Sequence, residues 1–269
     1  MNKLLVIISL LLSVCLASVS AQEHDEHDHD HGPIHFSHPM ITESASPDTK
    51  IRFDYGFQRF TDGDADRVND HTPRVEIEYA FNKHVSVAVT VPYTFRRPEM
   101  SPPNLSSSHL DNVEISLKAV TFRAAERGFL PVYGISFGLP SGSDSGIGSD
   151  HVVEVEPFAG LGYKHKRLEL IGFGKFGFQT NRRGTDEEGH AFGYNFSSLY
   201  NVTHRVQMML EMDGHTALTG EPGTVVNLSP GIKFLHPDHH WQFGASVGWP
   251  VTHTREFNVR GVLSVFYHF

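Results

Sequence analysis

The last stretch of the sequence, Phe257–Phe269, reads FNVRGVLSVFYHF and alternates in the manner of a β-strand. One set of alternate positions holds apolar or aromatic side chains and one glycine: Phe257, Val259, Gly261, Leu263, Val265, Tyr267 and Phe269. The stretch is long enough to cross a bilayer at a tilt. A soluble domain rarely ends on an apolar strand, because such an edge promotes aggregation. A closed membrane barrel needs a last strand that pairs with the first, so this feature favours a barrel over a buried terminal strand.

The same alternation begins near Lys50 and continues along the chain. In the first segment, Ile51 and Phe53 interleave with Arg52 and Asp54. We count about twelve such segments of roughly ten residues, which is the length of a tilted transmembrane strand. An even number of strands is typical of bacterial single-chain barrels.

The connections between these segments alternate between long and short. The long ones, rich in Asp, Gly, Ser and Pro, are Thr61–Pro73, Arg96–Ser108, Pro140–Asp150, Thr180–Glu188, Asp213–Pro222 and Pro250–Glu256. The tight ones are Asn82–Lys83, Ala124–Gly128, Lys164–Lys166, Asn201–His204 and His236–His240. Outer-membrane barrels have long outer loops, short periplasmic turns and periplasmic termini. Nothing in the architecture of a soluble sandwich requires long and short loops to alternate in this way. We therefore predict an all-β, antiparallel, up-and-down transmembrane β-barrel over residues 50–269.

The start of the sequence has the pattern of a secretory signal peptide. Lys3 supplies a positive charge, residues 4–17 are apolar, and small residues up to Ala21 offer a cleavage site. We predict that residues 1–21 are removed, together with the single cysteine, Cys15. Further along the sequence, no run approaches the ~18 apolar residues of a membrane helix. The net charge of −9 argues against nucleic-acid binding.

Residues 22–49 form a different kind of sequence, in which histidines alternate with carboxylates without a hydrophobic period. We predict a disordered periplasmic tail here, although its apolar residues at 34–36 and 40–41 can dock in a barrel mouth. Imidazoles and carboxylates are ligands for Zn, Ni, Cu or Co. The candidate ligands are His24, His27, His29, His31, His35 and His38, with His236, His239 and His240 as weaker candidates in one turn. The alternative is a solvated acidic tail with no metal role, and no resident cofactor is required.

The polar positions of the alternating segments are expected to face the barrel lumen, since the apolar positions face lipid. The predicted lumen-lining residues are Arg52, Asp54, Arg74, Glu76, Glu78, Glu114, Lys118, Glu154, Glu156, Glu169, Lys175, Glu211, Lys233 and Arg260. These charges can neutralise one another in a wet, packed interior, or they can line a narrow selective path. The glycines at 160, 162, 172, 174, 244 and 248 are expected to allow curvature, and Ile171 and Phe173 interrupt the alternation.

Two short patterns carry a resemblance to known families. Phe269, with Tyr267, Val265 and Leu263 before it, resembles the C-terminal signal of bacterial outer-membrane barrels, which implies the barrel-assembly machinery as a partner. The stretch SHPMITESASPDTKIRFD, at residues 37–54 before and into the first strand, resembles a family of bacterial outer-membrane transporters of the MetA phenol-degradation pathway type. This resemblance implies an outer-membrane barrel that passes small hydrophobic or organic solutes. It transfers no catalytic or ligand residue.

Enzyme motifs do not fit the sequence. Residues 142–146 read GSDSG, which has the wrong spacing for a nucleophile elbow. No Walker loop, dinucleotide fingerprint or HExxH motif is present. We predict a non-enzymatic channel or transporter in the outer membrane of a Gram-negative bacterium, in contact with lipid and a small-molecule or ion solute. The alternatives are a non-conducting, metal-binding or structural barrel and, third, a barrel lipid hydrolase with a spatial Ser–His pair.

Overall fold

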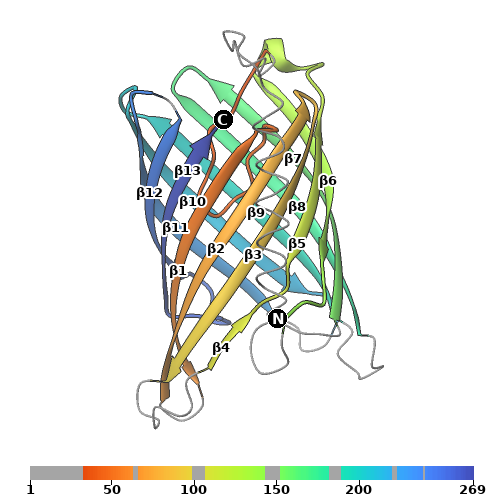
Figure 1. Cartoon of the computed structure of the whole chain (residues 1–269), viewed down its shortest axis with the longest axis vertical. Coiled ribbons are helices and arrows are strands. Elements are labelled where there is room, and N and C mark those ends of the chain that lie inside the picture. The colour runs from red at the N-terminus through yellow and green to blue at the C-terminus, as the bar shows by residue number, and fades with distance from the viewer. Residues whose placement is uncertain are drawn as a thin grey trace, which may run out of the picture. The chain divides into compact units, whose positions relative to one another are not determined.

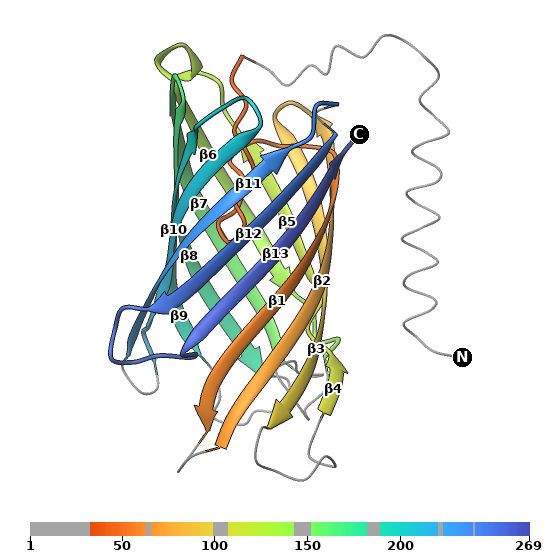
Figure 2. The same ribbon diagram turned by 90° about the vertical axis from the view of Figure 1, so that its left-hand side faces the viewer.

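The protein folds into a closed antiparallel β-barrel (Figures 1 and 2). A computed structural model describes residues 33–62, 66–98, 107–142, 152–181, 189–219, 223–238 and 240–269. The predicted signal peptide and the first part of the predicted tail, residues 1–32, lie outside this description.

The barrel wall is built from thirteen β-segments that form twelve strands. They are β1 (Lys50–Asp62), β2 (Asp66–Asn82), β3 (Val85–Pro98), β4 (Ser107–Leu110), β5 (Glu114–Val120), β6 (Phe129–Gly138), β7 (Val152–His165), β8 (Leu168–Asn181), β9 (His190–Asn201), β10 (Val206–Ala217), β11 (Thr224–Leu235), β12 (Trp241–Pro250) and β13 (Val259–His268). Both β4 and β5 pair with β3, so the two segments together make one strand of the wall. The predicted fold class is confirmed.

Closure of the barrel comes from the pairing of its first and last strands. Lys50 in β1 lies opposite His268 in β13, and the register continues to Arg59 opposite Val259. Each other strand pairs with its neighbours in the sequence, which gives the predicted up-and-down order. A single turn of 3₁₀ helix, η2 (Ala125–Arg127), follows β5. Within the described ranges, no helix is long and apolar enough to span a membrane.

The outer wall of the barrel carries the apolar side chains. In β1, Arg52 and Asp54 are buried, whereas Phe53 and Tyr55 are 45% and 38% exposed. Other large apolar side chains are exposed around the wall, among them Tyr79, Leu117, Tyr133, Met208, Trp241 and Leu263. A soluble monomer rarely exposes so much contiguous apolar surface, whereas a membrane barrel presents it to lipid.

We define the two ends of the barrel by their connections. The short-turn end carries the tight turns, the start of β1 and the end of β13, and it lies at the top of Figures 1 and 2. The opposite end is the long-loop end. There the strands run further than predicted, since β1 reaches Asp62 and β2 starts at Asp66, inside the predicted loop Thr61–Pro73. Beyond the bilayer both faces of a strand meet water, so strand pairing continues without hydrophobic alternation.

Residues 33–49, which we call the plug, precede β1 and lie inside the barrel near the short-turn end (Figure 2). Phe36, Met40 and Ala45 are fully buried there, and His38 is 1% exposed. The predicted disorder is therefore wrong for this part of the tail. Its apolar residues dock in the barrel mouth because they pack against an apolar part of the inner wall.

Candidate functional site: the plugged lumen

The plug has no regular secondary structure, so its buried backbone groups need partners from the barrel wall. Glu211 on β10 supplies the main anchor. Its carboxylate accepts hydrogen bonds from three successive backbone N–H groups, those of Met40, Ile41 and Thr42, at 3.1, 3.0 and 2.9 Å. Three convergent N–H groups form an anion-binding nest. The Glu211 side chain is fully buried. These hydrogen bonds therefore hold the plug and the Glu211 side chain together.

A second anchor involves Glu169 at the start of β8. Its carboxylate accepts the Ser37 N–H at 2.7 Å and pairs with the Lys164 ammonium at 2.9 Å. Lys164 also donates to the His35 carbonyl at 2.8 Å, and Gln207 donates to the Ser37 hydroxyl at 2.9 Å. The entry of the plug is thus fixed to three different strands of the wall.

Buried cations of the wall bind the plug through its carbonyl oxygens. Lys233 donates to the His38 carbonyl at 2.8 Å, Lys118 donates to the Ser44 carbonyl at 3.2 Å, and Arg52 donates to the Met40 carbonyl. Charge-assisted hydrogen bonds are stronger than neutral ones. Wall carboxylates therefore hold plug donors, while wall cations hold plug acceptors.

An apolar cluster holds the other face of the plug. Phe36 and Met40 pack with inward-facing residues of the wall: Val120, Leu130, Val132, Phe158, Ile171, Phe173, Leu199 and Met209. A Cβ atom at Gly162 would lie 2.7 Å from the Phe36 ring, and one at Gly244 would lie 2.6 Å from the Met40 sulfur. These two glycines make room for plug side chains, a role that the sequence analysis missed when it assigned them to curvature. Ile171 and Phe173 break the alternation because they belong to this cluster.

The predicted lumen-lining residues lie on the inward-facing side of their strands, and most of them are joined by ion pairs. The seven next to the plug are Arg52, Glu76, Glu78, Lys118, Glu169, Glu211 and Lys233, all of them buried. The other seven are Asp54, Arg74, Glu114, Glu154, Glu156, Lys175 and Arg260. Examples of ion pairs are Lys118–Glu78 at 2.8 Å and Lys175–Glu156 at 3.1 Å. A role of these residues in conduction stays a prediction.

Further ion pairs towards the long-loop end were missed by the sequence analysis. Arg96 on β3 donates to both carboxylate oxygens of Asp70 on β2, at 2.9 and 2.7 Å. Arg260 on β13 pairs with Asp213 on β10, with one contact at 3.2 Å. Asp70 and Asp213 fall within or at the edge of predicted loops, which is why periodicity did not place them in the lumen.

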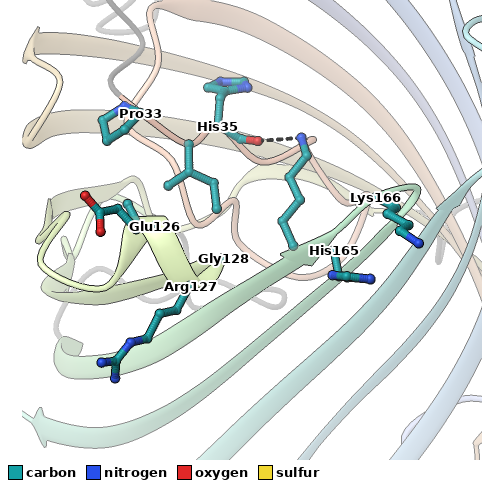
Figure 3. A pocket seen from close by; sticks show the side chains of 10 residues that line it. Pro33, His35, Glu126, Arg127, Gly128, His165 and Lys166 are labelled. Atoms are coloured by element: carbon teal, nitrogen blue, oxygen red, sulfur yellow. Dashed lines mark hydrogen bonds between the residues drawn. The ribbon is translucent and has the colours of Figure 1, made fainter.

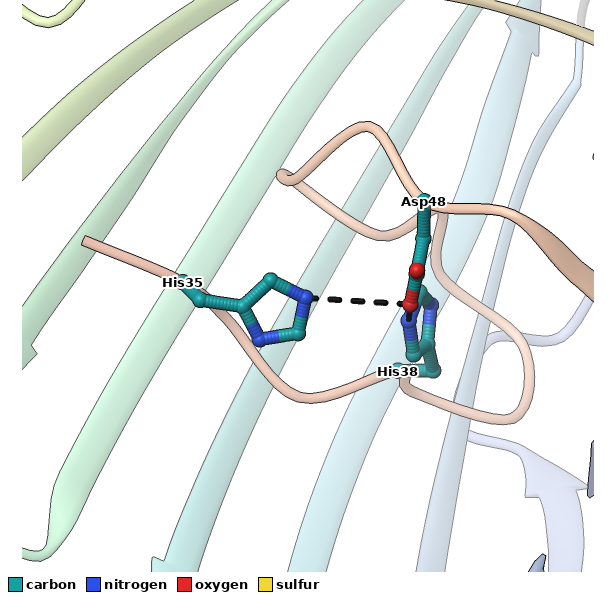
Figure 4. A group of neighbouring side chains, drawn as sticks. All are labelled: His35, His38 and Asp48. Atoms are coloured by element: carbon teal, nitrogen blue, oxygen red, sulfur yellow. Dashed lines mark hydrogen bonds and ion pairs between the residues drawn. The ribbon is translucent and has the colours of Figure 1, made fainter. Parts of the chain in front are cut away.

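Three histidines and one carboxylate meet where the plug joins β1, and Figure 4 shows His35, His38 and Asp48 of this group. Asp48 Oδ2 lies 2.8 Å from His38 Nε2, 2.7 Å from His268 Nδ1 and 3.7 Å from His35 Nε2. Burial, aided by the charge of Lys50, lowers the pKa of His38 well below its ordinary value. Burial acts to raise the pKa of Asp48, but hydrogen bonds from the histidines outweigh it and hold that pKa well below its usual range.

Of the other predicted metal ligands, His236 and His240 are described, and neither belongs to this cluster. His24, His27, His29 and His31, and also His239, lie outside the described residues. His236 is exposed beside Asp238 at 2.9 Å, and His240 lies 2.8 Å from the His268 carbonyl oxygen.

A pocket of about 520 Å³ opens at the short-turn end, beside the entry of the plug (Figure 3). It lies between Pro33–His35, the turn around η2 and the β7–β8 turn at Lys164–Lys166. Gly128 closes the η2 turn with a φ of 82°, and a Cβ there would lie 2.4 Å from the Lys164 carbonyl oxygen. His35 therefore faces this pocket on one side and Asp48 on the other.

The fold and its interior define a class of structure, a closed twelve-stranded antiparallel β-barrel with an apolar outer wall. No family model matches the chain, and no curated protein matches its sequence. Among solved structures, the COG4313 outer membrane channel from Pseudomonas putida F1 is similar with a TM-score of 0.64 at 12% identity, over 92% of this chain and 100% of that one. The NanC porin has a TM-score of 0.54 at 8% identity, over 82% and 98% of the two chains. The KdgM porin has a TM-score of 0.50 at 15% identity, over 82% and 99%. Identities this low show a shared fold.

Proposed function

We propose that this protein is an outer-membrane channel for a small solute, and that the plug controls passage through its lumen. The observation that carries the proposal is the plug itself, a segment without secondary structure that is held inside a charged barrel by hydrogen bonds and ion pairs. Such contacts can be exchanged for contacts with water, unlike the strand pairing of the wall. The apolar outer wall and the shared fold with channels and porins support the location and the class.

The orientation of the barrel is part of this proposal. The short-turn end faces the periplasm and the long-loop end faces the outside, as in outer-membrane barrels generally. The start of β1 and the end of β13 meet at the short-turn end, which supports this orientation. The plug then enters from the periplasmic side, and the histidine-rich residues before it lie in the periplasm, where they bind divalent transition metal.

The lumen favours polar or ionic solutes. Ion pairs such as Asp54–Arg74 and Asp70–Arg96 line it beyond the plug. Small solutes that carry charge or hydrogen-bonding groups can exchange with these contacts, whereas the apolar organic solutes implied by the family resemblance would leave the charges unsolvated. Rings of charge then set the selectivity of the path.

The second candidate is a non-conducting barrel, and the tight packing of Phe36 and Met40 inside the wall favours it. Conductance separates the two functions. The mature chain, residues 22–269, and a chain that starts at Lys50 are refolded, checked by heat-dependent gel mobility and measured in planar bilayers. We expect discrete current steps from the chain without the plug and smaller or rarer steps from the mature chain. Silence from both folded forms would overturn the channel and leave the structural or metal-binding barrel.

A further inference from the structure

We infer that His35, His38, Asp48 and His268 form a binding site for one divalent transition-metal ion, which fastens the plug to the last strand of the barrel. The existence of the site does not depend on conduction, whereas its use in controlling passage rests on the proposed function. Figure 4 shows three of the four side chains converging. His35, His38 and Asp48 belong to the plug, and His268 ends β13.

The separations of the donor atoms fit a metal ion. One donor atom each from His35, His38 and Asp48 lies within 4.8 Å of the others. His268 does not belong to this group of three, but its Nδ1 lies 2.7 Å from Asp48 Oδ2, so a movement of its side chain would bring it in as the fourth ligand. Zinc bonds of about 2.0–2.1 Å in a tetrahedron place neighbouring ligand atoms roughly 3.3 Å apart. The distances of 2.8 and 3.7 Å from Asp48 Oδ2 to the His38 and His35 nitrogens lie on either side of that value. Side-chain movements that bring the histidine nitrogens towards that separation would complete the site.

The hydrogen bonding of the cluster also points to a ligand. A carboxylate oxygen has two lone pairs, yet three imidazole nitrogens are directed at Asp48 Oδ2. His38 is 1% exposed, so its ring depends on this cluster for a partner to Nε2. A metal ion between the rings and the carboxylate would give a partner to each nitrogen that is directed at Asp48.

The chemistry of the donors selects the kind of metal. Imidazole nitrogens with one carboxylate oxygen suit Zn, Co, Ni or Cu, whereas Mg and Ca prefer sites made of oxygen. The ligands must also be free of protons. The Lys50 ammonium beside them is paired with Glu76 and Glu78, so its charge is locally neutralised.

The pocket at the short-turn end gives the ion a route to the site (Figure 3). The His35 side chain is 33% exposed and lines this pocket, so it is the first ligand that an entering ion meets. The four histidines at positions 24–31 precede the plug in the sequence and can raise the local metal concentration. A bound ion would join the beginning of the plug, its end at Asp48 and the wall at His268. The site thus acts as a clasp on the plug.

Zinc titration of the mature chain tests the site. The four tail histidines are first replaced in the full mature chain (H24Q/H27Q/H29Q/H31Q), so that any remaining site lies outside residues 24–31. Calorimetry with ZnCl₂ is expected to show one saturable site, and MgCl₂ none. Adding His35→Gln and His38→Gln is expected to weaken binding by more than the roughly 10–100-fold that loss of an outer-shell partner costs. His204→Gln, in an exposed turn, is the matched control and is expected to bind as before.

Hydrogen exchange of the plug amides measures how firmly the metal ion holds the plug. This measurement does not require the barrel to conduct. At Zn²⁺ about 100 times its Kd, exchange of the plug amides is expected to slow by about 100-fold, because opening must release the ion. Because His35 is partly exposed, His35→Gln alone keeps the test valid if His38→Gln fails to fold. No saturable zinc site in the tail variant, or equal binding by the His35→Gln and His204→Gln chains, would overturn the inference. A zinc site in a barrel that never conducts would instead overturn the proposed function and leave the site in place.

Discussion

Glu211 and Asp213 lie two residues apart on the same face of β10, yet they belong to two different parts of the lumen. Glu211, towards the short-turn end, accepts three backbone N–H groups of the plug. Asp213, towards the long-loop end, pairs with Arg260 of the wall. A carboxylate on the same strand thus holds the plug in one case and cross-links the wall in the other.

The comparison extends to the whole interior. Next to the plug, Lys118, Lys233 and Arg52 donate to plug carbonyls. Beyond it, Asp70 and Arg96 pair with each other across neighbouring strands. Charges in the first region contact the plug, and we propose that charges in the second select the ions that pass. Substitutions in the two regions are therefore expected to have different effects.

The largest effect is expected from Glu211→Ala. If the plug stays buried, three N–H groups lose their acceptor, and each unsatisfied buried group costs about 1–3 kcal/mol. We expect the plug to leave the lumen instead. A Thr42→Cys probe detects this, since Thr42 is 1% exposed and the predicted mature chain has no cysteine of its own. Maleimide labelling of Cys at this position is expected to be slow in the parent and at least tenfold faster with Glu211→Ala.

Asp213→Ala is the matched control for this experiment. It removes a carboxylate from the same strand and face but takes no acceptor from the plug. Labelling at position 42 is expected to stay slow, and Glu211→Gln, which keeps one acceptor oxygen, should give an intermediate rate. Equal labelling of the Glu211→Ala and Asp213→Ala variants would remove the distinction between the two regions.

A smaller effect is expected from substitutions that fill the space occupied by the Phe36 ring. In Gly162→Ala the new Cβ would lie 2.7 Å from the fully buried Phe36 ring, so the ring and the plug backbone must move. Overpacking of this kind costs about 1–3 kcal/mol. Gly244→Ala is expected to be milder because the atom it meets is the flexible Met40 sulfur. Plug stability, measured by hydrogen exchange of residues 33–49, is expected to fall in that order.

Gly193→Ala provides the comparison in the other region. A Cβ there would meet only the Lys175 side chain and a backbone oxygen, at 3.6 Å or more, which is ordinary contact. In this variant the plug amides are expected to exchange hydrogen at the same rate as in the parent protein. Adding Phe36→Ala to Gly162→Ala should abolish the extra penalty of the glycine substitution. If the penalty persists in the double variant, Gly162 is needed for the structure of the wall and not for making room for the Phe36 ring.

The sequence predicted the wall of the barrel well, because lipid imposes a single rule on it. Every outward position within the bilayer must be apolar. The side of the wall on which residues such as Arg52 and Phe53 lie could therefore be predicted directly from the sequence. This rule does not apply to the parts of the strands that extend beyond the bilayer. The Asp70–Arg96 pair lies on strand extensions that lack a hydrophobic period, so the pair was missed.

The interior could be predicted only in part. Charges at positions such as Glu211 were assigned to the lumen, but their partner was not, since the nest for Glu211 forms only when residues 40–42 turn inside a closed wall. His35 and His38 were identified as candidate ligands from composition. Asp48 and His268 were not, because strand register alone brings the end of β13 beside the start of β1. Contacts between residues this far apart in sequence leave no local pattern.

The smallest effect, and the sharpest test of the second region, is expected from Arg96→Gln in the chain that starts at Lys50. The substitution removes one cation and leaves Asp70 as an uncompensated negative charge in the lumen. A unit charge at about 4 Å in a water-filled path contributes ~1 kcal/mol, so cation permeability should rise and anion permeability should fall by no more than about fivefold each, which raises their ratio. The reversal potential in a salt gradient measures this ratio. Arg205→Gln, in an exposed short turn, removes the same charge outside the lumen and is expected to leave the ratio unchanged. An equal shift in both variants would mean that overall charge, and not the Asp70–Arg96 pair, sets the selectivity.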